Sequence, residues 1–124
     1  MSGMMAASEA LERILPVVHV FLREAEHRYP VKEAYIFGSY ALGEAGPESD
    51  IDLAVISEAF SGQRFEDNVA LSKLTWGIDT RIEPIAFRPE ALQADTPLTI
   101  AIRRTGIRVY PGQKLQGSGG NDAP

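Results

Sequence analysis

The chain has 124 residues, of which 44% are hydrophobic and 23% are charged, and its formal net charge is −5. These values are typical of one globular domain, and they exclude a wholly disordered chain, a collagen and a coiled-coil rod. An acidic chain does not coat nucleic acid through bulk charge, although a metal ion can still supply the positive charge for a small nucleotide. Because the sequence contains no cysteine, disulfides and thiolate zinc sites are excluded as well.

No apolar run approaches the ~20 residues that a membrane helix needs. The first eight residues also lack the basic start and apolar run of a secretory signal. We therefore expect a cytoplasmic protein without a membrane segment.

The first predicted element is a helix over residues 8–29. Its apolar positions recur at steps of three and four residues: Leu11, Ile14, Leu15, Val18, Phe21, Leu22 and Ala25. Ser8 is the expected N-cap, and Pro30 disfavours helical backbone in the residue before it. Pro16 lies inside the pattern and is expected to kink the helix or divide it in two.

A strand is expected next, at residues 31–37, and it ends at a Gly-Ser corner. Residues 39–42 then form a single helical turn, and a loop with glycine and proline covers residues 44–49. Residues 50–56 form a second strand that is apolar on both faces past its acidic residues, as in a covered central strand.

The second half of the chain continues the alternation. The expected elements are a helix at 64–76, a strand at 81–87, a short helix at 89–94, a helix at 96–105 and a strand at 107–110. Thr96 and Pro97 fit the start of the last helix. Trp76 is interpreted as a core or interface aromatic. Residues 111–124 have almost no apolar content and are expected to form a disordered C-terminal tail.

This order predicts an α+β fold, a two-layer sandwich of helices on a small mixed sheet, as one domain over residues 1–110. The connection between the first two strands is too short to hold a full crossover helix. The first two strands are therefore expected to pair antiparallel.

The stretch that carries chemistry is G-S-Y-A-L-G-E-A-G-P-E-S-D-I-D-L-A-V. Asp50 and Asp52 are two residues apart on a strand, so their carboxylates project from one face and suit Mg²⁺. Gly38 and Ser39 open a helical turn whose free N–H groups can face a phosphate. Each motif alone is more often a plain turn or a strand cap, but together they indicate phosphoryl or nucleotidyl transfer.

The same stretch resembles the signature of a known family. The pattern G-S-x-A-x-G followed by S-D-x-D-L-x-V is met by Gly38, Ser39, Ala41, Gly43, Ser49, Asp50, Asp52, Leu53 and Val55. It is similar to the signature of the minimal nucleotidyltransferases of the DNA polymerase β superfamily, and the predicted order of elements fits that fold.

The resemblance implies a role for each motif residue. Gly38 and Ser39 would hold the triphosphate of ATP, and Asp50 and Asp52 would bind two Mg²⁺ ions. A third carboxylate on a neighbouring strand would act as a metal ligand or as the base for the attacking hydroxyl.

Glu83 is the candidate for that third carboxylate, although the family usually has Asp there. Asp79 is the alternative, but it lies where a helix turns into a strand and Asp is common for local bonding. The plain structural interpretation of Glu83 is a solvated strand residue that pairs with Arg81.

The function implied by the resemblance is Mg²⁺-dependent transfer of AMP from ATP to a hydroxyl. Larger relatives carry a helical acceptor domain, which we do not expect in a chain whose pattern ends near Tyr110. Relatives of this size pair with a helical HEPN-type toxin, so we expect an antitoxin that binds or modifies such a partner. The alternatives are a non-catalytic antitoxin module and an aminoglycoside-type adenylyltransferase. A homo-oligomer is also compatible with the sequence.

Overall fold

The computed structural model describes residues 2–111, with side chains from residue 9 onward. The elements are α1 (Ser2–Arg28), β1 (Glu33–Phe37), α2 (Ser39–Leu42), β2 (Ile51–Ile56), α3 (Arg64–Thr75), β3 (Ile82–Phe87), α4 (Pro89–Leu92), α5 (Pro97–Thr105) and β4 (Ile107–Tyr110). The predicted order of helices and strands is confirmed. Most of the predicted tail, residues 112–124, lies outside the described residues.

The first helix differs from the prediction in its starting residue and in its continuity at Pro16. It starts at Ser2, so Ser8 lies inside it and is not its N-cap. The helix is also not divided at Pro16, although a proline removes one backbone hydrogen bond and its ring crowds the preceding turn. Ile14 and Val18, on either side of Pro16, are buried against the sheet, and this packing holds the helix together across that position.

The four strands form one mixed sheet in the order β3-β2-β1-β4. β1 pairs antiparallel with β2 and with β4, whereas β2 and β3 run parallel. The predicted antiparallel pairing of the first two strands is therefore confirmed. The parallel pair forms because α3 carries the chain from β2 back to the start of β3.

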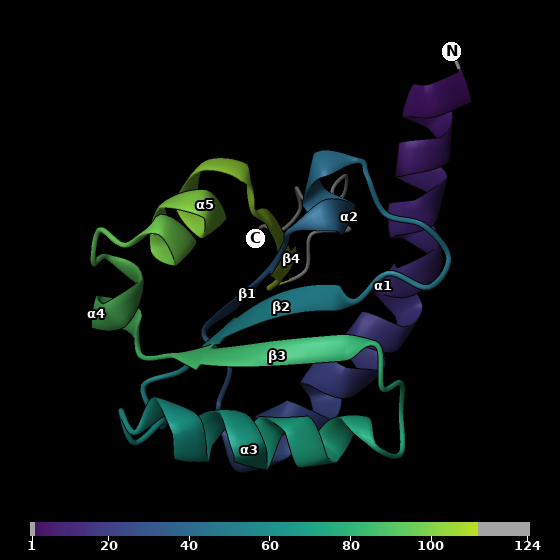
Figure 1. Cartoon of the computed structure of the whole chain (residues 1–124). Helices are drawn as coiled ribbons and strands as arrows, with labels where there is room; N and C mark the ends of the chain where they lie inside the picture. Colours follow the sequence, from purple (N-terminus) through teal and green to yellow (C-terminus); the bar gives the residue numbers. More distant parts are fainter. Residues whose placement is uncertain (1, 112–124) are drawn as a thin grey trace, which may run out of the picture.

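The two faces of the sheet are covered differently (Figure 1). α1 and α3 cover one face with the main core, into which Leu53 and Val55 point from β2. α4 and α5 lie on the other face, where they pack on Ala54 and Ile56. Asp52 alternates with Leu53 and so belongs to this second face, beyond the part that α4 and α5 cover.

One expectation is narrowed at α3. The outer side of this helix carries apolar side chains that the fold leaves exposed: Phe65, Val69 and Trp76. Trp76, which directly follows α3, is 72% exposed and is therefore not a core residue, whereas the interpretation as an interface aromatic stays a prediction. α3 buries its opposite side instead, through Leu71 and Thr75. Within residues 2–111, none of the helices has the length and apolar character needed to cross a membrane.

Candidate functional site

The Gly-Ser corner lies directly against Asp52. Phe37 and Asp52 are partners in the antiparallel pairing of β1 and β2, so the residue after Phe37 comes next to the Asp52 side chain. Gly38 has φ 74°, and a Cβ atom on it would lie 2.2 Å from Oδ2 of Asp52. Only glycine fits both the backbone conformation and this approach. The turn that follows is closed by a 3.0 Å bond from the Leu42 N–H to the Gly38 carbonyl.

Three carboxylates gather beside this corner. Asp52 and Glu83 are register partners on the parallel strands β2 and β3, so their side chains leave the sheet side by side. Asp50 precedes β2 by one residue. Sequence reasoning proposed these three residues as one group, and the structure brings them together at one end of the sheet.

The electrostatics of the group are unfavourable in the absence of a cation. Burial raises the pKa of Asp52, and the charge of Asp50 raises it further. Burial also raises the pKa of Glu83, with added contributions from the charge of Asp50, a hydrogen bond to Asp50 and the charge of Asp52. The pKa values of Asp52 and Glu83 are thus raised first by burial and then by the neighbouring carboxylates, and both effects oppose ionisation.

The donor chemistry of the group fits a divalent metal. Carboxylate oxygens are the ligands that Mg²⁺ prefers, and a cation between them would relieve their repulsion. In the part of the chain that the structure describes, however, no three Asp, Glu or His side chains surround a single point as in a preformed metal site. Binding would thus require small rotations of the Asp50, Asp52 or Glu83 side chains.

Asp79 lies in a different environment from this group. Its carboxylate accepts hydrogen bonds from Nε and Nη2 of Arg81 at 3.1 and 2.8 Å and from the Arg81 backbone N–H at 2.9 Å. Hydrogen bonding to Arg81 lowers the pKa of Asp79. Arg81 thus pairs with Asp79 and not with Glu83, contrary to the plain structural interpretation of Glu83.

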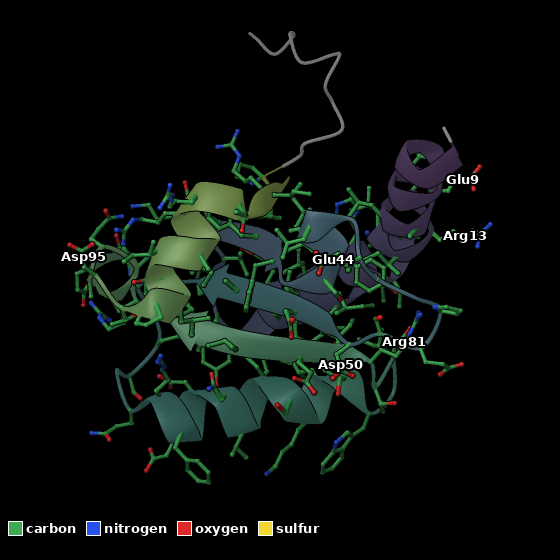
Figure 2. The ribbon with its side chains drawn as sticks, turned by 45° about the horizontal axis from the view of Figure 1, so that its top comes forward. Glu9, Arg13, Glu44, Asp50, Arg81 and Asp95 are labelled. Atoms are coloured by element: carbon green, nitrogen blue, oxygen red, sulfur yellow. The ribbon has the colours of Figure 1, made fainter. Side chains whose placement is uncertain are left out.

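Arg81 has a second role that the sequence did not reveal. Its Nη1 donates to the Pro47 carbonyl at 3.3 Å, which ties the loop before Asp50 to the start of β3. The Arg81 carbonyl accepts the Ile51 N–H at 2.8 Å, so Arg81 and Asp50 lie at the same end of the sheet (Figure 2). The D-x-R spacing of Asp79 and Arg81 was the only available signal, and it does not point to Pro47.

Behind the loop lies a hollow of about 440 Å³. The hollow lies between the loop and α1. Glu9 and Arg13 of α1 line it (Figure 2), and Tyr40 lines it as well. Tyr40 itself is buried and donates a 3.5 Å hydrogen bond to the Gly46 carbonyl. The loop is therefore held from both sides, by Tyr40 and by Arg81.

Comparison with known proteins shows the family of the chain. Residues 18–100 match the family described as nucleotidyltransferase domain, and the chain belongs to that family. None of the curated proteins matches.

Two solved structures share the fold. A candidate nucleotidyltransferase from Sulfolobus solfataricus is 20% identical, with a TM-score of 0.60 over 83% of this chain and 85% of that one. A toxin–antitoxin structure with AMP-PNP is 24% identical, with a TM-score of 0.58 over 81% of this chain and 75% of that one. The predicted nucleotidyltransferase core is thus confirmed.

Proposed function

We propose that this chain is a Mg²⁺-dependent adenylyltransferase that moves AMP from ATP to a hydroxyl on a partner protein, a HEPN-type toxin, and so acts as its antitoxin. The observation that carries the proposal is the meeting of Asp50, Asp52 and Glu83 beside the Gly38 corner. The family match supports nucleotidyl transfer, and the fold shared with a toxin–antitoxin structure that contains AMP-PNP supports the partner and the nucleotide.

In this proposal the chain's own residues divide the work. Gly38 and Ser39 bind the phosphates through the turn that opens α2, and Asp50 and Asp52 hold two Mg²⁺ ions. The bound ions would neutralise charge on the phosphates and on the leaving group. Glu83 orients the acceptor hydroxyl and takes its proton, or contributes a further metal ligand.

The transfer of AMP forms one bond and breaks one bond at the α-phosphorus. The acceptor oxygen forms a bond to the α-phosphorus of ATP, the bond from that phosphorus to the bridging oxygen breaks, and pyrophosphate leaves. The hydroxyl proton passes to the Glu83 carboxylate.

The test is label transfer. The purified chain is incubated with Mg²⁺, a lysate of the source organism and ATP labelled at the α-phosphate, beside an Asp52→Asn variant and a second reaction with γ-labelled ATP. A protein band that carries the α label only, and that needs Asp52, is the expected result. Label on a small molecule would instead favour an aminoglycoside-type enzyme.

A second function is favoured by one observation. Within the described residues, the three carboxylates are not arranged as a preformed metal site. The chain would then be an antitoxin that binds its toxin without turnover. The absence of Asp52-dependent label on every species, together with no Mg²⁺-dependent ATP binding by calorimetry, would replace the enzyme proposal with this one.

A further inference from the structure

The outer side of α3 is an apolar surface that the fold does not use. Phe65 is 80% exposed, Val69 is 38% exposed and Trp76 is 72% exposed. With Ser72 they follow one another at steps of four, three and four residues, so the four side chains form one stripe along the helix. α3 forms the lower margin of the molecule in Figure 1, and no described element lies on its outer side. We call these four residues the α3 stripe.

The neighbouring edge of the sheet does not admit another strand. The backbone of Ile82, Pro84 and Ala86 faces away from β2, because alternate residues of a strand face the same edge. The Ile82 N–H donates to the Asp79 carbonyl at 3.2 Å, and the Ala86 N–H donates to Oδ1 of Asn68 at 2.7 Å. Pro84 has no N–H. An added strand would find no free donor at these three residues, so a partner that covers this side of the molecule would bind through the side chains of α3.

We infer that the partner is a second copy of this chain, bound through an antiparallel pair of α3 helices. A twofold axis that passes between Ala70 and Leu71 brings Phe65 of each copy opposite Trp76 of the other. The same axis brings Val69 opposite Ser72. The α3 stripe is therefore complementary to itself, as a twofold interface requires.

The charges beside the α3 stripe support the antiparallel arrangement. Glu66 and Lys73 are both exposed and lie on the same flank of the stripe. They are seven residues, about 10 Å, apart along their own helix and cannot pair with each other. In residues 9–111, neither has an opposite charge within 4.0 Å.

In the antiparallel pair, each Glu66 comes within about one helical turn of Lys73 of the other copy, and two equivalent ion pairs form. A parallel pair would put the two charged flanks on opposite sides of the interface and form neither. The apolar stripe and the charged residues Glu66 and Lys73 are thus both complementary to themselves in the same antiparallel dimer.

The structure also offers space for the aromatic ends of the α3 stripe. A hollow of about 400 Å³ lies between α3 and the outer edge of β3, and Ser72, Thr75 and Trp76 line its helix side. Phe65 of the second copy, opposite Trp76, would enter this hollow. Glu83 also lines this hollow, but its side chain leaves the sheet on the same face as that of its register partner Asp52, opposite to α3. The dimer therefore leaves the carboxylates of Asp52 and Glu83 accessible.

The experiment is sedimentation velocity of the full chain over a concentration series, with Trp76 emission followed in parallel. The wild type is expected to shift from monomer to dimer as concentration rises, and the emission of its single tryptophan should shift to shorter wavelength. Glu66→Lys and Lys73→Glu are each expected to weaken dimerisation about tenfold, because each variant replaces two ion pairs by like-charge contacts. The double variant E66K/K73E should restore the dimer, since the pairs form again with their signs exchanged.

Val69→Lys tests the apolar part of the α3 stripe, and Val20→Lys is its matched control. The two valines are 38% and 39% exposed, on α3 and α1 respectively, so similar changes in solubility and folding are expected. Val69→Lys should abolish the dimer and Val20→Lys should leave it unchanged. A wild type that stays monomeric throughout the series would overturn the inference. A dimer that tolerates Val69→Lys, or that the double charge exchange does not restore, would overturn it equally.

Discussion

Two acidic regions at one end of the sheet have opposite electrostatics. Asp79 is bound by the guanidinium and backbone of Arg81, and its pKa is lowered. Asp52 and Glu83 face each other and Asp50, and their pKa values are raised. Asp79 therefore stabilises the folded chain, whereas the ionised Asp52 and Glu83 destabilise it. A group of carboxylates that the fold brings together without a cation is typical of a site that binds one.

The largest effect that tests this comparison is expected for Asp52→Asn. The substitution removes one carboxylate of the group, and nucleotidyl transfer should fall at least about a hundredfold. The same variant should show a slightly higher melting temperature without Mg²⁺, because a like-charge repulsion is lost. Activity and melting temperature are measured on the same samples.

Glu44→Gln is the control for Asp52→Asn, since Glu44 is an exposed carboxylate close to α2 (Figure 2). It should leave both quantities unchanged. A melting temperature of Asp52→Asn below that of the wild type would show that Asp52 stabilises the fold and would contradict the comparison.

The next largest effect is a loss of stability when Gly38, which lies against Asp52, is replaced. In Gly38→Ala the new Cβ would lie 2.2 Å from Oδ2 of Asp52, at a residue with φ 74°. We expect a loss of about 3 kcal/mol in the free energy of unfolding, measured by urea denaturation, because the backbone or Asp52 must move. Gly77→Ala is the matched control, because a Cβ there meets nothing within 4 Å. Equal stability of the two variants would be evidence against the close approach of Gly38 to Asp52.

A smaller effect is expected for Asp79→Asn. The carboxylate loses its charged hydrogen bonds to Arg81, and the free energy of unfolding should fall by about 1 kcal/mol after allowance for solvent exposure. Asp95→Asn is the control, because Asp95 also pairs with an arginine, Arg103, but its side chain is 78% exposed. That change should cost little. If both variants lose the same stability, burial of the Asp79 pair is not what distinguishes it.

The smallest effect is the pH dependence, and its sign separates the two regions. A lowered pKa means that the contribution of Asp79 is present above its unfolded pKa of about 4 and is lost as pH falls through the folded value. The raised pKa values of Asp52 and Glu83 mean that their contribution is present below their unfolded pKa and is lost as pH rises through the folded value.

The unfolding free energy of each variant is compared with that of the wild type from acidic to neutral pH. As pH rises, the unfolding free energy of Asp79→Asn should decrease relative to that of the wild type. The unfolding free energy of Asp52→Asn should increase relative to that of the wild type. Saturating Mg²⁺ should remove the gain of Asp52→Asn, because a bound cation offsets the repulsion in the wild type. Curves of the same sign for both variants would show that the two regions do not differ.

Much of the site could be predicted from sequence because its parts are local. Gly38 follows a strand, and Asp50 and Asp52 precede an apolar run, so the Gly-Ser corner and the acidic pair were both visible as short patterns. The choice between Glu83 and Asp79 was different. It depended on the register of two strands separated by a helix, and no pattern within either strand determines that register.

The sequence alone determined the order of elements, the buried stripe of α1 and the glycine and aspartates of the signature, because periodicity and spacing act over a few neighbouring residues. It did not determine that α1 continues through Pro16, which depends on packing against the sheet. Only the tertiary structure decided that Glu83 joins Asp52, that Arg81 binds Asp79, and that α3 turns Phe65 and Trp76 outward. These outcomes depend on which surfaces meet across the fold, and a contact between residues distant in the chain is decided by the packing of the whole molecule.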